Sequence, residues 1–273
     1  MNDKVKRRLE PWQSFLNVSE LEWLNIVCSS LESNFEYGKF ILNFNFINRK
    51  IGKRTIENEV SKTLLRECEQ QAWLPLMDTH FVARLIYLNA AGNLDKEDYL
   101  NNIRRMLLTF EHGEAIHFYR MLPMLPHSEN LIAEAEEILR TNSVEIFAAF
   151  SQNNPWPKNH FSESAWNRMV LKSVFMELEL DKVVGLHEKN NINLYDSLIQ
   201  YSKERKAASR KIPQDIWQLL FAYLKKEHMA FLEEYYAQRP EDEQSFILNT
   251  VKNCRAENNP AKAHLVFLNR ITA

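Results

Sequence analysis

The residues that could do chemistry gather in one stretch of the chain, between Asn153 and Arg210. This stretch contains two tryptophans, an isolated lysine in an apolar pattern, and a cluster of glutamate and arginine side chains. Such a set could clamp an anionic ligand, or it could combine general acid–base chemistry with a positive charge that stabilises a transition state. The candidate residues of a ligand-binding groove are Trp156, Trp166, Lys172, Glu188, Tyr201, Glu204, Arg205 and Arg210.

Trp156 stands between Pro155 and Pro157, which favours a stiff, extended linker. An indole on such a linker could lie against a groove, where it offers both contact area and one N–H donor. The same indole could instead close the end of a helical bundle. The packing role is the favoured interpretation of the two.

Lys172 lies within an apolar segment, Ala165 to Phe175, that covers most of a helix's circumference and is therefore expected to be a central helix. An unpaired ammonium group would be costly there. The side chain must reach solvent, pair with a carboxylate or meet an anionic ligand. A structural ion pair is favoured, and the acids to test as partners are Glu177, Glu188 and Glu204.

The segment YSKERKAASRK, residues 201–211, places Tyr201 and Arg205 on one face of a predicted helix. Small residues follow, which leave room for a ligand or for close approach of another helix. Arg205 and Arg210 could form a planar clamp on a carboxylate or phosphate. A solvated basic face is the alternative, because three lysines lie in the same segment.

Motifs for metals, cofactors and nucleophiles are missing from the sequence. His112 and His117 are five residues apart, which places them about 140° apart on a helix. Glu114 and His117 supply only half of the paired Glu-x-x-His set of a di-iron centre. There is no glycine-rich phosphate loop, GxSxG motif or aspartate-rich magnesium box. We expect no metal and no cofactor, and a non-enzyme is favoured over an enzyme.

Composition narrows the class of protein further. The net charge of −2 gives no overall attraction for nucleic acid, so no nucleic-acid partner is expected. No apolar run is long enough to span a membrane, and the basic start of the chain lacks the apolar core of a signal peptide. The three cysteines are widely spaced, which disfavours a disulfide framework or a zinc site. A cytoplasmic protein without a transmembrane segment is expected.

The chain reads as helical almost throughout. Only five glycines occur among its 273 residues, and apolar residues recur at helical spacing, as in Trp23, Ile26, Val27 and Leu31. We predict an all-α protein, either an antiparallel helical bundle or a short solenoid of helix pairs, with about ten to twelve helices. No sequence word repeats at a fixed period.

Residues 1–273 are expected to form a single domain, with an internal boundary between helical halves near residues 121–130, where two prolines interrupt helix. A capping box of Ser19 and Glu22 is expected to open the first helix. The helices expected in the first half are Ser19–Leu31, Tyr37–Asn48, Thr55–Cys68, Asp78–Ala91, Asp95–Glu111, Glu114–Leu122 and Ser128–Asn142.

Four ordered motifs in this chain resemble the EboA-like family. They are NPWP at 154–157, AWNRMVLKSVF at 165–175, GLHEKNN at 185–191 and YSKERKAASRK at 201–211. The upstream segments RKIGKRTI at 49–56 and YRMLPMLPHSENLIAEAEEILRTN at 119–142 fit the family's pattern as well, so the resemblance covers most of the chain. The chain departs from the pattern at His187, Lys189, Lys203 and Lys206.

The resemblance implies a context and no reaction. EboA-like proteins belong to a bacterial gene-cluster system, the ebo system, which makes or moves a secondary metabolite. We therefore expect an accessory protein that binds a small-molecule pathway intermediate or another protein of the ebo system. One alternative is an enzyme acting on an anionic or cyclitol-like intermediate, with Glu188 or Glu204 as general acid or base. The other is a helical scaffold whose tryptophans are only core.

Overall fold

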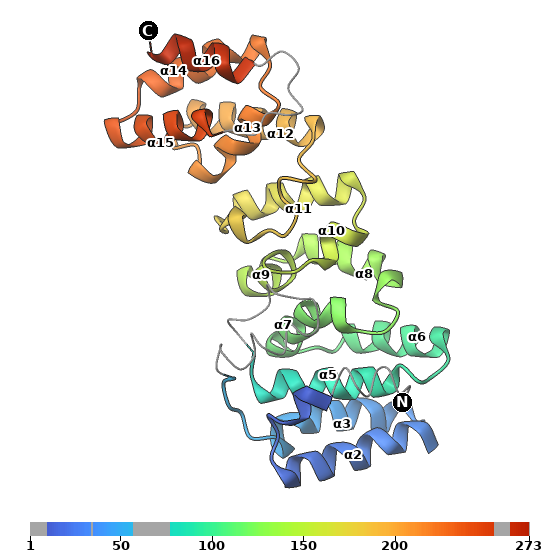
Figure 1. Ribbon diagram of the computed structural model, residues 1–273. Coiled ribbons are helices and arrows are strands. Elements are labelled where there is room, and N and C mark those ends of the chain that lie inside the picture. Colours follow the sequence, from blue (N-terminus) through green and yellow to red (C-terminus); the bar gives the residue numbers. More distant parts are fainter. Residues whose placement is uncertain (1–9, 34, 57–76, 254–262, 273) are drawn as a thin grey trace. The chain divides into compact units, whose positions relative to one another are not determined.

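The computed structural model describes residues 10–33, 35–56, 77–253 and 263–272 (Figure 1). These residues form helices and no strand, apart from an isolated antiparallel bridge between Thr55 and Asp78. The prediction of an all-α protein is confirmed. The expected number of ten to twelve helices is too low, because the described residues alone contain more. The prediction joins segments into single helices where the structure has several short helices separated by tight turns.

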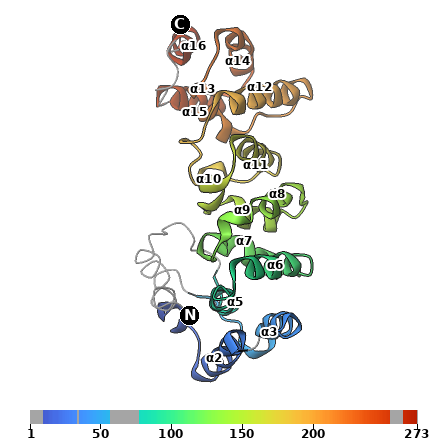
Figure 2. The ribbon, with the colours of Figure 1, turned by 90° about the vertical axis from the view of Figure 1, so that its right-hand side faces the viewer.

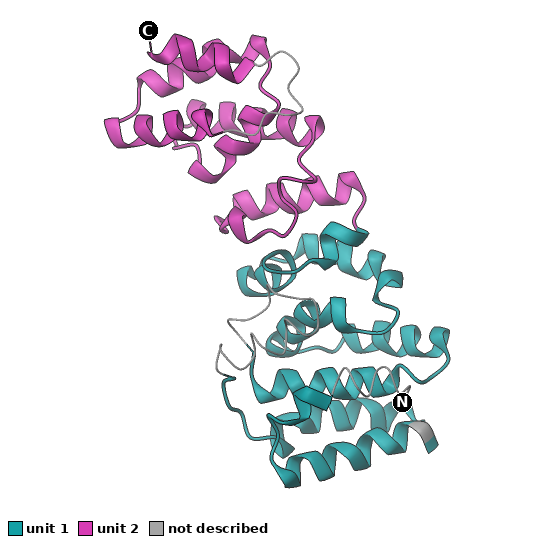
Figure 3. Cartoon of the chain, viewed as in Figure 1, with its two compact units in different colours: residues 1–160 teal, residues 161–273 magenta. Residues whose placement is uncertain are grey.

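Contacts within the chain divide it into two compact units, Met1–His160 and Phe161–Ala273, called here the first and second unit (Figure 3). The boundary expected near residues 121–130 falls inside the first unit, where the chain makes two short 3-10 turns. The grouping of both units into one domain stays a prediction.

In the first unit, the helices are stacked in chain order from α2 to α10 (Figures 1 and 2). Helix α5 packs against α2, α3 and α7, and α7 packs against α9. Every residue of α5 is buried as a result. The α-helices of this unit are α2 Val18–Ser33, α3 Tyr37–Lys50, α5 Thr79–Ala91, α6 Lys96–Leu107, α7 His112–Met121, α8 Ile132–Glu137, α9 Val144–Ser151 and α10 Trp156–His160.

The predicted helices at 37–48 and 78–91 are confirmed as α3 and α5. Asp78 caps α5, because its side chain accepts a hydrogen bond from the backbone N–H of Phe81 at 2.8 Å. The capping box of α2 is formed two positions before the expected one. Asn17 Oδ1 accepts from the backbone N–H of Glu20, and the carboxylate of Glu20 accepts from that of Asn17, both at 2.9 Å.

The predicted helix from Ser128 to Asn142 is wrong as a single element. The chain forms a 3-10 turn, the short helix α8 and a second 3-10 turn there, because Leu131 leaves the helical conformation at φ −103° and ψ 28°. Leu131 is buried, so packing and not local propensity sets the backbone at this point. Of the helix predicted at 55–68, Thr55 and Ile56 are not helical, and the remainder lies outside the described residues.

The second unit is built from α11 Glu163–Phe175, α12 Ile192–Ala207, α13 Trp217–Ala222, α14 Met229–Ala237, α15 Glu241–Lys252 and α16 Ala263–Thr272. Helix α11 packs on α12, α12 on α13, and α13 on both α15 and α16. Aromatic rings join α13 to α16. The ring of Phe221 lies 5.6 Å from that of Trp217 and 5.3 Å from that of Phe267, measured between ring centroids.

The described helices are expected to contain no membrane-spanning segment. None of their helices combines the length and the apolar character that a membrane crossing requires.

An ion pair ties the start of α2 to the segment that follows α3. The carboxylate of Glu20 accepts hydrogen bonds from Arg54 Nη1 at 2.9 Å and Nη2 at 2.6 Å, and from the backbone N–H of Gly52 at 2.7 Å. The Glu20 side chain is 4% exposed. The hydrogen bonds from Arg54 are the largest cause that lowers the pKa of Glu20 to about 2. The ionised carboxylate therefore stabilises the first unit at neutral pH.

We expect Glu20→Gln to lower the free energy of unfolding at pH 7 by about 2 kcal/mol, since Arg54 is partly exposed and solvent screens the pair. A carboxylate with a lowered pKa stabilises the fold above its unfolded value of 4.5, and this contribution disappears as the pH falls toward 2. Urea denaturation at several pH values should show the difference between wild type and variant shrink over that range. Exposed Glu22 on the same helix provides the control, Glu22→Gln. A difference that does not change with pH would contradict this account.

Candidate functional site

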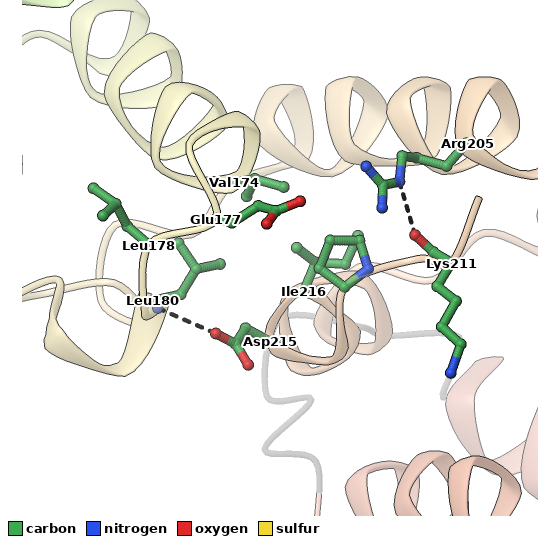
Figure 4. A pocket seen from close by; sticks show the side chains of 9 residues that line it. Val174, Glu177, Leu178, Leu180, Arg205, Lys211, Asp215 and Ile216 are labelled. Atoms are coloured by element: carbon green, nitrogen blue, oxygen red, sulfur yellow. Dashed lines mark hydrogen bonds between the residues drawn. The ribbon is translucent and has the colours of Figure 1, made fainter. Parts of the chain in front are cut away.

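A pocket opens in the second unit where the ends of α11 and α12 meet two 3-10 turns, η5 (Leu180–Lys182) and η6 (Gln214–Ile216) (Figure 4). Its volume is about 250 Å³. Apolar side chains and four charged side chains share its wall. The lining residues are Val174, Glu177, Leu178, Leu180, Arg205, Lys211, Pro213, Asp215 and Ile216.

The pocket wall next to α11 is formed by the turn that ends this helix. The backbone N–H of Leu178 donates to the carbonyl of Ser173 at 3.0 Å, and that of Glu177 to the carbonyl of Val174 at 3.2 Å. This pattern is a Schellman motif, in which the residue in the left-handed conformation is usually glycine. Here that residue is Glu177, with φ 55°. The strained backbone of Glu177 thus lies at a residue whose acidic side chain lines the pocket.

Arg205 enters the pocket from the last turn of α12. Its Nε donates to the backbone carbonyl of Lys211 at 2.7 Å, and its guanidinium carbon lies 5.7 Å from the centre of the Tyr201 ring. Tyr201 in turn meets the ring of Phe175 edge to face at 4.9 Å. These contacts hold the guanidinium in place. Its two Nη groups have no hydrogen-bond or ion-pair partner within the described part of the chain.

The other two charged residues of the pocket are already engaged. Lys211 pairs with Glu243 through its ammonium group, and this hydrogen bond raises the pKa of Lys211, so the ammonium stays protonated. Asp215 Oδ2 accepts a hydrogen bond from the backbone N–H of Leu180 at 3.3 Å. Figure 4 shows Asp215 reaching toward Leu180 and the Lys211 ammonium pointing away from the other lining residues. The charges left for a ligand are those of Arg205 and Glu177.

A second hollow of about 270 Å³ lies along the loop from Leu180 to Glu188. Gly185 turns this loop with φ 83°, a conformation that glycine adopts at little cost. Glu188 lines this hollow and does not line the pocket of Arg205. Glu204 is exposed and does not line the pocket of Arg205 either. Neither of the two acids in the enzyme hypothesis therefore belongs to that pocket.

The predicted groove residues thus lie in several environments. Tyr201 and Arg205 come together at the pocket, and Trp166 is completely buried beneath the Lys189 ammonium, which lies 5.1 Å from the centre of the ring. Lys172 is half-buried, and Arg210 is exposed. A ligand-binding role of the whole set stays a prediction.

Trp156 belongs to the first unit and to its core. It begins α10, so the interpretation of an extended linker is wrong and the packing role is confirmed. The indole is 1% exposed, its Nε1 donates to Ser128 Oγ at 3.2 Å, and its ring lies 4.8 Å from that of His160. Proline at the second position of a helix is well tolerated, which is why Pro157 does not prevent α10.

Sequence reasoning missed Glu177 as a pocket residue and considered it only as a partner for Lys172. It also missed Asp215 and the exposed ring of Phe175 beside the pocket. One signal was available: Glu177 follows an apolar helix closely, at a position where a glycine would be expected to end it.

A second cluster of polar side chains lies in the first unit. The guanidinium of Arg84 donates to His117 Nδ1 at 2.8 Å and to Glu114 at 3.3 Å, with all three groups largely buried. Burial first, and then the charge of Arg84, lower the pKa of His117 to about 3, so this ring is neutral and accepts the hydrogen bond. Among the described residues, no three His, Cys, Asp or Glu side chains are placed to hold a metal ion.

The comparisons with known proteins give a family. Residues 5–221 match the family model described as metabolite traffic protein EboA, so the chain belongs to the EboA family. The match includes every residue that lines the pocket and ends before α14. Neither the search of curated proteins nor that of solved structures gave a significant match.

The strain at Glu177 predicts that Glu177→Gly raises the free energy of unfolding by about 1 kcal/mol, because glycine adopts the left-handed conformation without a Cβ clash. Thermal or urea denaturation measures the effect. The control is Glu179→Gly in the same loop, where φ is −64° and glycine gains nothing. We expect that variant to be less stable than wild type by about 0.5 kcal/mol. Equal effects of the two substitutions would contradict the account of strain.

The core position of Trp156 predicts a large loss of stability on Trp156→Ala, about 3–5 kcal/mol, because the cavity left by the indole cannot be refilled. Trp156→Phe keeps most of the packing and loses the hydrogen bond to Ser128, so its loss should be near 1 kcal/mol. Chemical denaturation monitored by circular dichroism distinguishes the two. A small effect of the alanine variant would show that the indole is not needed for the core.

Proposed function

We propose that this protein is a non-catalytic accessory protein of a bacterial secondary-metabolite system and that it binds an anionic pathway intermediate in the pocket of the second unit. The guanidinium of Arg205 carries the proposal. It is held by the Lys211 carbonyl and the Tyr201 ring, and its Nη groups face the pocket without a partner in the described residues. An arginine fixed in this way is ready to bind a carboxylate or phosphate through two parallel hydrogen bonds.

The size of the pocket supports a small ligand. Its volume of about 250 Å³ lies just below the roughly 300–1,000 Å³ of sites for drug-sized molecules. Val174, Leu178 and Ile216 supply an apolar wall beside the charges. A compact metabolite with one anionic group fits this combination, and the family description of metabolite traffic agrees with binding and release.

The two acids named in the enzyme hypothesis lie outside the pocket. A general acid or base must reach the reacting atom directly or through one water molecule. Glu188 and Glu204, the acids of the enzyme hypothesis, do not line the pocket of Arg205. Asp215 is engaged with the backbone of Leu180, and Lys211 is kept protonated by Glu243, which makes it unsuited as a base. Glu177 is the remaining acid of the lining, and the proposal treats it as a binding group, so we place the enzyme hypothesis second.

One observation favours a protein partner as a further candidate. Phe175 is 64% exposed at the end of α11, next to Tyr201. An exposed aromatic ring beside a fixed arginine is a combination typical of binding hot spots. Another protein of the ebo system could contact this position while the pocket is occupied. The cytoplasmic location stays part of the proposal.

The proposal predicts that Arg205→Gln weakens binding of inorganic phosphate and of simple carboxylates by about tenfold or more, because a charge-assisted pair of hydrogen bonds is lost. Arg205→Lys should recover only part of the affinity, since an ammonium group cannot form the planar double contact. Titration calorimetry measures the dissociation constants.

The matched control is Lys203→Gln, which removes the same charge from the same helix at an exposed position outside the pocket. Its affinity should equal that of wild type. If both variants bind like wild type, or if both lose affinity equally, Arg205 is not the anchor of an anion and the proposed function fails.

A further inference from the structure

We infer that the ligand of this pocket is amphoteric: it carries an anionic group that binds Arg205 and a protonated amine that binds Glu177. This inference rests on the proposed function and adds the chemical class of the ligand. It starts from Glu177, whose exposed carboxylate engages in no hydrogen bond or ion pair within the described part of the chain.

The backbone at Glu177 strengthens the argument. A left-handed residue that ends a helix is most often glycine. A glutamate there adds strain, while its carboxylate makes no hydrogen bond or ion pair with the described residues. The exposed acids nearby differ, since Glu179 pairs with Lys182 at 2.5 Å. Among the described residues that line the pocket, Glu177 combines backbone strain with an unengaged carboxylate. These properties are expected of a side chain that binds a ligand.

Arg205 and Glu177 face the same space from different elements and form no ion pair with each other. Figure 4 shows their side chains extending toward one another above Ile216. A ligand with charges of one sign would be attracted by one of these groups and repelled by the other. A ligand with an anion at one end and an ammonium at the other would satisfy both.

The part of the pocket between the two charges is apolar. Ile216 and Val174 lie in the wall and are buried, so the middle of the ligand meets hydrocarbon. A short carbon skeleton that joins an amine to a carboxylate or a phosphate has this pattern. Amino acids and amino-alkyl phosphates belong to this class.

The test compares probes that differ only in the amine. Phosphoethanolamine is titrated against ethyl phosphate, and γ-aminobutyrate against butyrate, with the full-length wild-type protein. We expect the amine to increase affinity by about twofold to fivefold, the range of an ion pair with an exposed carboxylate. Ethanolamine alone should bind more weakly than either phosphate, because Arg205 is then unused. The anionic group of the ligand is inferred from the pair that binds more tightly: a phosphate if phosphoethanolamine does, a carboxylate if γ-aminobutyrate does.

Glu177→Gln should remove the advantage of the amine and leave ethyl phosphate binding unchanged or slightly stronger, because a repulsive charge is gone. Glu179→Gln, which lies outside the pocket, should retain the advantage. If the amine gives no advantage in wild type, or if Glu177→Gln preserves it, the amphoteric ligand is refuted while anion binding by Arg205 still stands. If no anionic probe binds at all, the proposed function fails together with this inference. The wild-type comparison decides even where a variant folds poorly.

Discussion

A Schellman turn ends both α11 and α12, and in each the left-handed position is taken by a residue other than glycine, Glu177 in one and Ser209 in the other. The turn after α11 directs the chain into η5 and places Glu177 in the pocket wall. The turn after α12 brings the Lys211 carbonyl back to the Nε of Arg205, six residues earlier in the chain. The pocket therefore depends on how these two helices end. If α11 continued, Glu177 would lie elsewhere, and if α12 continued, Arg205 would lose the Lys211 carbonyl that holds its guanidinium.

The two units use buried and exposed charges differently. In the first unit, the enclosed carboxylate of Glu20 accepts several hydrogen bonds, so its charge stabilises the fold, and the buried guanidinium of Arg84 is paired with Glu114. In the second unit, Lys211 and Asp215 are engaged with other groups of the protein. The Nη groups of Arg205 and the carboxylate of Glu177 have no partner among the described residues. The fold leaves these groups without a partner, and the proposed ligand of complementary charge would supply one. This contrast is also why the stabilising substitution Glu177→Gly is expected to reduce function.

The sequence predicts most helices because their apolar periodicity is long and regular. Helices α3 and α5 lie close to the ranges that this periodicity predicts, and the all-α class is predicted correctly for the same reason. The break at Leu131 could not be predicted, since nothing in the local sequence marks this buried residue as the point where the helix stops. Arg205 was a candidate from its segment alone. Its neighbours in the pocket were not, because no spacing rule tells which helix ends meet, and Glu177 was recognised only when the structure placed it opposite Arg205. Trp156 misled for a related reason: the flanking prolines suggest an extended chain, whereas Pro157 occupies a helix's first turn.

The central claim is that Arg205 anchors a small molecule, and native mass spectrometry of the protein purified from its own cells tests it most directly. Wild type and Lys203→Gln should each carry the same additional small mass, and Arg205→Gln should carry none. Fragmentation of the released compound would then show whether it contains both an acidic group and an amine. An additional mass that Arg205→Gln retains would contradict the account, as would a partner protein that co-purifies with no small molecule present.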